Sequence, residues 1–276
     1  MNKILVPIDF SKSSEFACKM ASKIAKKSNS SIYLLHMIEL PSGIVDMGAG
    51  SNFSIPESML YLRKIKDRIL EYKEMYFSKN KEVHHAIKFQ HPFDGILKYT
   101  EKINPDLIVM GYKGHSEFEE ILIGSNTEKV VRTASIPVLV VKRDEEKINI
   151  KDIVFASSFN KADEIVVLEK VQKFANAFKS KIHLLTVNTQ PNLKALLMLN
   201  KKIINYIEDL NLSKYTINIY SDATVERGIL HFAKEIDADL IALATHGRSG
   251  IAHLFTNSVT KTLSKNALRP VLTIKL

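Results

Sequence analysis

The chain has 276 residues, of which 45% are hydrophobic and 25% are charged, ordinary values for a globular protein. Its 10 glycines and 8 prolines are too few for a fibrous or broadly disordered chain. The net charge of +9 is spread along the whole length, without a run of about five like charges or an aromatic-rich RNA-binding signature, which argues against nucleic acid binding.

The apolar segments are too short for a membrane protein. No stretch approaches the roughly 18 uncharged apolar residues that a membrane-spanning helix requires. The first apolar run, 4–8, is too short for a signal peptide and is followed at once by Asp9. We therefore predict a cytoplasmic protein. Cys18 is the only cysteine, so it forms no intrachain disulfide and no cysteine-based zinc site, and we expect it to be a small core residue.

Strand and helix patterns alternate from the start of the chain. Short apolar runs predict buried parallel strands, and apolar residues four positions apart predict one face of a helix. In the first half we predict strands at 4–8, 31–37, 82–89, 107–110 and 137–141. The helices predicted between them comprise one that carries Phe16, Met20 and Ile24 and three more over 55–76, 93–103 and 125–134.

The second half repeats this order, beginning with strands at 153–156 and 182–187 that flank a helix. Three tripeptides recur with an offset of 133 residues: Gly95-Ile96-Leu97 as Gly228-Ile229-Leu230, Asp106-Leu107-Ile108 as Asp239-Leu240-Ile241, and Pro137-Val138-Leu139 as Pro270-Val271-Leu272. Near the start the offset is 149, so the first copy carries 16 additional residues. We place them in the Gly- and Ser-rich segment 41–56, which we predict to be a long loop.

Alternating strands and helices predict parallel sheets with helices on both faces. We expect two Rossmann-like α/β domains, 1–143 and 150–276, each with a five-stranded parallel sheet, and a charged linker over 142–151. Ligands of such sheets bind beyond the carboxyl ends of the strands, where the strand order reverses. The residues that follow the first and fourth strands are therefore the first candidates for a site.

A glycine motif follows the fourth predicted strand. Gly111 and Gly114 are followed, after nine residues, by Gly124 and Ser125, which gives the spacing G-x2-G-x9-G-S. Glycines let backbone N–H groups approach a phosphate closely, and the start of a helix adds N–H groups without partners. The alternative is that Ser125 and Glu128 form a capping box and that Gly124 only turns the chain.

Three segments resemble the universal stress protein A family, and the resemblance covers nearly the whole chain, twice. They are ILVPIDFSKSSEFACKMASKIAKK, IYLLHMIE and MGYKGHSEFEEILIGSNTEKVVRTASIPVLVVK. The resemblance implies a tandem protein with two domains of the adenine nucleotide alpha hydrolase-like type, and its glycine motif is typical of the ATP-binding branch. In the family the final strands pair across a two-fold axis, so 137–141 and 270–274 are expected to pair as an intrachain pseudo-dimer. A further homodimer stays an open alternative.

The resemblance also implies that the first copy binds ATP, with Mg²⁺ held through the phosphates. Asp9 would accept hydrogen bonds from ribose hydroxyls, and its alternative role is to cap the following helix. The adenine pocket would be lined by Pro7, Ile8, Met37 and Met110, each of which is otherwise an ordinary core residue. The ribose and phosphates would be held by Gly111, Gly114, Gly124, Ser125 and Asn126, with His115 and Thr127 as weaker candidates.

The second copy departs from the motif. Asp9 aligns with Ser158, Gly111 with Ala244 and Gly124 with Asn257, whereas only Gly247 and Ser258 are retained. Side chains at 244 and 257 would stand where backbone should meet phosphate. We therefore predict that the second copy binds ATP poorly or not at all.

Two groups of histidines were weighed as metal sites. His84, His85 and His91 lie near the third strand, but adjacent residues of a strand point to opposite faces and do not easily share a metal. His246 and His253 follow the fourth strand of the second copy, where a solvated loop explains them. We assign no metal site.

The function expected from these observations is nucleotide-dependent regulation of protein partners, with ATP ordering 41–56 and 114–124. A slow ATPase is one alternative, although the motif supplies no evident general base and no Walker-type metal-binding acid. We therefore assign no catalytic residue. The other alternative is an interaction module that binds no nucleotide, in which the glycines serve only as turns.

Overall fold

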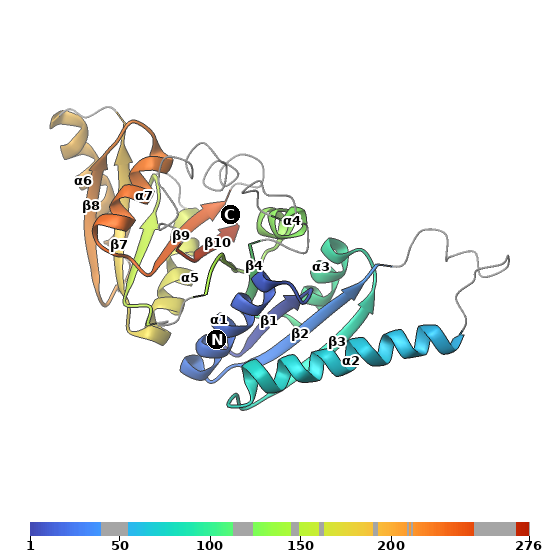
Figure 1. Cartoon of the computed structure of the whole chain (residues 1–276). Helices are drawn as coiled ribbons and strands as arrows, with labels where there is room; N and C mark the ends of the chain where they lie inside the picture. The colour runs from blue at the N-terminus through green and yellow to red at the C-terminus, as the bar shows by residue number, and fades with distance from the viewer. Residues whose placement is uncertain are drawn as a thin grey trace.

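The computed structural model describes residues 1–39, 55–112, 124–144, 149–159, 163–189, 193–208, 210, 212–245 and 269–275 (Figure 1). The first copy contains β1 (Lys3–Ile8), α1 (Lys12–Ser28), β2 (Ser31–Ile38), α2 (Ile55–Phe77), β3 (Val83–Phe89), α3 (Pro92–Ile103), β4 (Leu107–Gly111), α4 (Ser125–Thr133) and β5 (Val138–Val141). The second contains β6 (Asp152–Ala156), α5 (Asp163–Phe178), β7 (Lys181–Asn188), α6 (Leu193–Ile207), β8 (Tyr215–Ser221), α7 (Val225–Glu235), β9 (Leu240–Thr245) and β10 (Val271–Lys275).

The strands form one ten-stranded sheet in the order β3-β2-β1-β4-β5-β10-β9-β6-β7-β8. Neighbouring strands within each copy are parallel, and each copy has the same internal order. The copies join where β5 pairs antiparallel with β10, with Leu139 opposite Leu272. The predicted fold and the predicted pairing of the final strands are therefore confirmed, and Figure 1 shows the two copies side by side around this junction.

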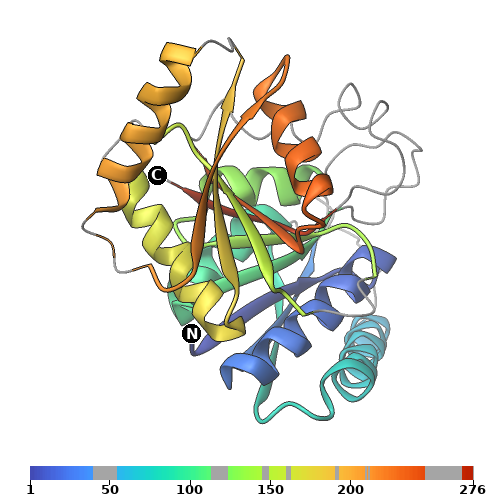
Figure 2. The same ribbon diagram turned by 90° about the vertical axis from the view of Figure 1, so that its left-hand side faces the viewer.

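Helices cover both faces of the sheet, and the apolar core lies between them and the strands. On one face α1, α2, α5 and α6 pack on a single cluster that runs through both copies. On the other face α3, α4 and α7 pack on a second cluster. Figure 2 shows that the sheet is strongly twisted, so the helices of the two copies point in different directions on either side of the junction. The buried strands read as continuous apolar runs because both of their faces are covered.

The recurring Asp-Leu-Ile tripeptide has a structural cause. The Oδ2 atom of Asp106 accepts hydrogen bonds from the backbone N–H groups of Asn2, at 2.6 Å, and Lys3, at 3.0 Å. In the second copy Oδ2 of Asp239 accepts from the N–H groups of Lys151 and Asp152 at 2.7 and 2.9 Å. Each aspartate thus ties the start of its copy's first strand to the start of the fourth.

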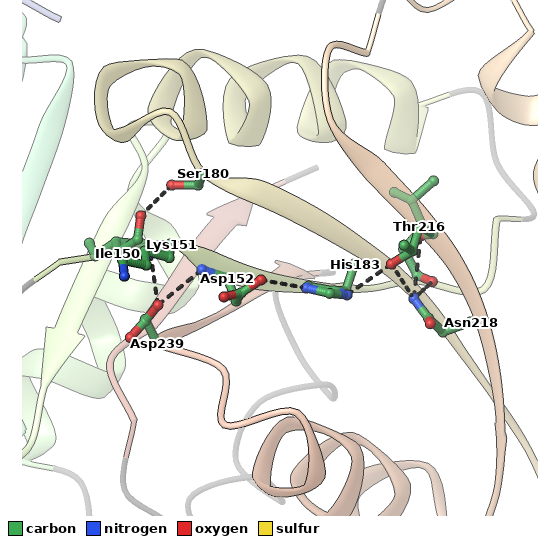
Figure 3. A network of polar contacts seen from close by, with 9 residues as sticks. Ile150, Lys151, Asp152, Ser180, His183, Thr216, Asn218 and Asp239 are labelled. Atoms are coloured by element: carbon green, nitrogen blue, oxygen red, sulfur yellow. Dashed lines mark hydrogen bonds and ion pairs between the residues drawn. The ribbon is translucent and has the colours of Figure 1, made fainter.

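The second copy also holds a polar network at the start of its strands (Figure 3). His183, which is 8% exposed, places Nε2 2.9 Å from Oδ1 of Asp152 and Nδ1 2.8 Å from Oγ1 of Thr216. Because a carboxylate can only accept, Nε2 carries the proton and the Thr216 hydroxyl donates to Nδ1. Asn218 donates in turn to Oγ1 of Thr216 at 3.0 Å. The network fixes three neighbouring strands, far from the carboxyl ends where ligands of such sheets bind.

Part of the additional length of the first copy lies in a helix. Helix α2 has 23 residues, whereas α6, at the same place in the second copy, has 15. Ile55 and Pro56 lie in α2, so the prediction that the loop extends to residue 56 is wrong. The rest of the predicted loop, 41–54, lies outside the described residues. No helix in the described part of the chain is both long and apolar enough to cross a membrane.

Candidate functional site

A cavity of about 270 Å³ lies beyond the carboxyl ends of β1 and β4, where the strand order reverses. It brings together the following predicted site residues: Pro7, Ile8, Asp9, Met37, Met110, Gly111, Gly124, Ser125, Asn126 and Thr127. Gly114 and His115 lie outside the described residues. The cavity also has four lining residues that we did not predict: Ser14, Leu35, Pro92 and Ile96. Its position agrees with the rule that ligands of open parallel sheets bind at this point.

The apolar part of the cavity lies between β2, β4 and α3. Leu35, Ile96 and Met110 are each at most 5% exposed and belong to one core cluster. The side chain of Met37 lies against the backbone of Gly95, where an added Cβ would come within 1.9 Å of the methionine Cε. In the second copy a Cβ on Gly228 would lie 2.5 Å from Cγ1 of Val187, so the same kind of contact requires glycine there. This explains why glycine recurs in the Gly-Ile-Leu tripeptide. The result is an apolar slot with one flexible wall.

Asp9 lies in the turn between β1 and α1. Its Oδ1 accepts a hydrogen bond from the N–H of Ser11 at 3.0 Å. The N-cap of α1 is Ser11, whose hydroxyl oxygen accepts from the N–H of Ser14 at 3.2 Å, so the alternative that Asp9 itself caps this helix is wrong. Within the described part of the chain, Oδ2 of Asp9 accepts no hydrogen bond. One carboxylate oxygen is thus anchored, and the other is available to a ligand.

The start of α4 has no side-chain cap within the described part of the chain. Gly124 is the N-cap and Ser125 is the first helical residue, so the alternative capping box of Ser125 with Glu128 is wrong. The first helical hydrogen bond runs from the N–H of Glu128 to the carbonyl of Gly124 at 2.9 Å. The N–H groups of residues 125–127 have no partner in the described ranges. They give this end of the cavity a positive partial charge suited to an anion.

Two hydrogen bonds hold the first turn of α4 against β4. The N–H of Gly124 donates to the carbonyl of Tyr112 at 2.8 Å. The hydroxyl of Thr127 donates to the carbonyl of Gly111 at 2.9 Å, so this side chain has a structural role whether or not it meets a ligand. Together they fix the N–H groups of α4 relative to the cavity.

Gly111 is required by helix packing. A Cβ on Gly111 would lie 2.6 Å from the carbonyl carbon and oxygen of Ser13 in α1. The close approach of α1 to β4 therefore explains this glycine without a phosphate. Gly124 has φ −57° and ψ 136°, a conformation open to any residue, so its backbone does not explain why it is glycine.

His36 contacts the two residues that flank Asp9, Ile8 and Phe10, from the face of the sheet opposite the cavity. Its Nδ1 donates to the carbonyl oxygen of Ile8 at 2.8 Å, and its ring packs on Phe10 with centroids 4.6 Å apart. Burial lowers the pKa of His36, so the ring is neutral at neutral pH. Thr186 makes the matching bond in the second copy, to the carbonyl of Ser157 at 2.9 Å. The sequence showed no sign of this role because it depends on strand pairing.

A partly buried lysine lies beside Tyr112, the residue that directly follows β4. The Nζ atom of Lys142 is 4.0 Å from the centroid of the Tyr112 ring. Burial lowers the pKa of Lys142 to about 8 and raises the pKa of Tyr112 to about 12. Lys142 follows β5 directly, so this contact joins the end of the first copy to the base of the motif.

Two of the three histidines near β3 each lie close to a different carboxylate. Nε2 of His84 is 2.8 Å from Oε1 of Glu82, and Nε2 of His91 is 3.4 Å from Oε1 of Glu39. Burial and the neighbouring Lys73 and Lys66 lower the pKa of His85. Among the described residues no three His, Cys, Asp or Glu side chains converge on a point that could hold a metal. His246 and His253 lie outside the described residues.

Cys18 is fully buried in α1, as predicted, and burial raises the pKa of its thiol. We expect the native protein to show no reaction with a thiol reagent such as Ellman's reagent over an hour, and one thiol per chain to react after denaturation in guanidinium. Fast reaction of the native protein would contradict the buried position.

Comparisons with known proteins agree with this architecture. The model of the universal stress protein family matches residues 1–142 and again 149–275. Two universal stress proteins of Methanocaldococcus jannaschii are each 31% identical, over 145 and 160 residues; the alignments cover 52% and 51% of this chain and 84% and 94% of those proteins. A universal stress protein structure from Archaeoglobus fulgidus aligns at TM-score 0.70 and 23% identity, over 99% of this chain and 96% of that one, and supports the fold. The chain belongs to the universal stress protein family and carries two copies of its domain in tandem.

Proposed function

We propose that this chain is a nucleotide-binding regulatory protein whose first copy binds ATP. The observation that carries the proposal is one cavity, at the reversal of strand order, that has an anchored carboxylate at one end and an uncapped helix start at the other. A nucleoside phosphate has matching chemistry, because its ribose hydroxyls donate hydrogen bonds and its phosphates accept them.

The described residues fit the three parts of the nucleotide. Leu35, Met37, Ile96 and Met110 form an apolar slot suited to a purine ring. Asp9 would accept hydrogen bonds from the ribose, and the N–H groups of residues 125–127 would receive the phosphates. Mg²⁺ would bind through the phosphates, since Mg²⁺ needs few protein ligands when phosphates are present.

ATP is proposed here as a regulatory ligand rather than a substrate. Among the described lining residues, Asp9 is the only side chain that can act as a general base near neutral pH, and the proposal places it on the ribose. Regulation requires that the bound and free forms differ in the surface they offer to protein partners. The predicted segments that would carry this change, 41–54 and 114–123, lie outside the described residues.

We expect one ATP per chain in an equilibrium titration with labelled ATP, because the second copy has Ser158 in place of Asp9 and Ala244 in place of Gly111. Hydrogen exchange should show ATP-dependent protection in residues 9–14 and 124–128 and none in 157–159. Mass spectrometry of the purified protein should detect an adenine nucleotide.

Two equivalent sites per chain would contradict the predicted difference between the copies. Protein that neither copurifies with nor binds adenine nucleotide at millimolar concentration would reject the proposed function and leave the nucleotide-free interaction module.

A further inference from the structure

A second cavity, of about 280 Å³, lies at the other end of the strands, where the two copies meet. Residues before β4 and β5 form one side, and α5 and β10 of the second copy form the other. In Figure 2 the yellow helix α5 lies beside the start of the chain. Met1 and three residues of α5 line this cavity. It shares no described lining residue with the proposed nucleotide cavity, so the two are independent.

The cavity has an apolar floor and a basic rim. Leu107, Phe174 and Leu272 form the floor and are each at most 5% exposed. Lys170 and Lys173, about one turn apart on α5, form the rim. Neither lysine has an acidic partner within the described part of the chain.

The described lining has one acid, Asp106, so at most one of the two lysine charges is balanced. Oδ2 of Asp106 accepts hydrogen bonds from the backbone N–H groups of Asn2 and Lys3. The cavity thus combines a net positive charge from the two lysine side chains with an apolar surface. This combination suits a ligand with an anionic head and an apolar body.

The internal repeat has different residues at the matching place in the second copy. Counted back from Asn29 and Lys179, the left-handed residues that follow α1 and α5, Lys170 corresponds to Met20, which is 1% exposed and packs in the core. Ile136 aligns with Arg269, whose Nη2 is 2.8 Å from Oδ1 of Asp237 and whose Nε donates to the carbonyl of Ala238. At that place the basic side chain is therefore paired with an acid of its own copy. At the cavity the corresponding residue is the uncharged Ile136, and the basic side chains, Lys170 and Lys173, come from the facing helix α5.

We propose that this interdomain cavity binds a small amphipathic organic anion, such as a medium-chain carboxylate. Its charged head would meet Lys170 and Lys173, and its apolar body would lie on Phe174 and the facing leucines of β4 and β10. Because the walls come from both copies, the bound anion would stabilise their junction.

The test uses the full chain with 8-anilinonaphthalene-1-sulfonate as the fluorescent probe and saturating ATP present. We expect saturable binding of one probe per chain. Octanoate should displace the probe, whereas 1-octanol at the same concentration should not, since it has the same chain without the charge. Lys170→Met, which copies the residue of the other repeat, should weaken probe binding about tenfold, the loss expected for a hydrogen bond to a charged group.

Lys27→Met is the matched control, because Lys27 is an exposed lysine in the last turn of α1, away from the cavity. It should bind the probe as the unchanged chain does. Ile136→Trp, which fills the cavity, should also abolish binding, and melting by circular dichroism checks that it folds. If it does not fold, Lys170→Met and the octanoate–octanol pair still decide the question. Absent or unsaturable binding, equal displacement by octanol, or unchanged binding in Lys170→Met would each overturn the proposal.

Discussion

Gly111→Ala is expected to lower the free energy of unfolding by about 3 kcal/mol, at the upper end for overpacking a core. The new Cβ would meet the carbonyl carbon and oxygen of Ser13 at 2.6 Å. These are backbone atoms in the first turn of α1, so no side-chain rotation relieves the contact and the helix must move away from β4. Urea unfolding followed by circular dichroism measures the change.

Gly95→Ala is the matched control for this prediction. Its Cβ would come even closer to a neighbour, 1.9 Å, but that neighbour is the terminal methyl group of Met37, which can rotate. Alanine also gains about 1 kcal/mol over glycine inside a helix, which offsets the adjustment in α3. We expect stability within about 1 kcal/mol of the unchanged chain. Equal destabilisation by the two substitutions would refute the account of Gly111.

The same pair separates stability from ligand binding. Gly95→Ala displaces Met37, a lining side chain of the nucleotide cavity, so ATP affinity should fall although the fold is intact. Gly111→Ala shifts the start of α1, next to Asp9 and Ser14, and should lower both stability and affinity.

Asp9→Asn is expected to weaken ATP binding by about 10- to 100-fold while stability stays within about 0.5 kcal/mol. The amide oxygen of asparagine can keep the hydrogen bond from the N–H of Ser11. The amide NH₂ group then replaces Oδ2, the oxygen that accepts nothing in the described structure, and it cannot accept a hydrogen bond from a ribose hydroxyl. Isothermal titration with ATP measures the affinity, and urea unfolding measures the stability.

Asp144→Asn serves as the control, because Asp144 forms an exposed ion pair with Lys19 and does not line the cavity. Exposed pairs contribute little, so this variant should bind ATP and unfold as the unchanged chain does. If Asp9→Asn binds ATP with unchanged affinity, Asp9 does not contact the ligand. If it loses stability and affinity together, the carboxylate acts through the turn instead.

The sequence by itself determined the fold. Both faces of β1, β4 and their counterparts β6 and β9 are buried, so these strands appear as short apolar runs, and the repeated tripeptides showed that the chain folds twice in the same way. The pairing of β5 with β10 was expected from the family resemblance and agrees with the need of an apolar edge strand for a partner. The glycine motif was found as a candidate site because strand ends and glycines mark binding positions in parallel sheets, and Asp9 was added by the family resemblance.

Only the tertiary structure decided which of these residues serve packing and which are left for a ligand. Gly111 is a packing requirement set by Ser13. Helix α4 starts one residue earlier than the capping pattern suggests, with Gly124 as its N-cap, and this leaves the N–H groups of residues 125–127 without a partner in the described ranges. Leu35 and Ile96 belong to the cavity wall, and Lys170 faces a cavity made by both copies. These contacts cannot be read from the local sequence, because they join residues far apart in the chain and depend on how α1, α3 and α5 pack on the sheet.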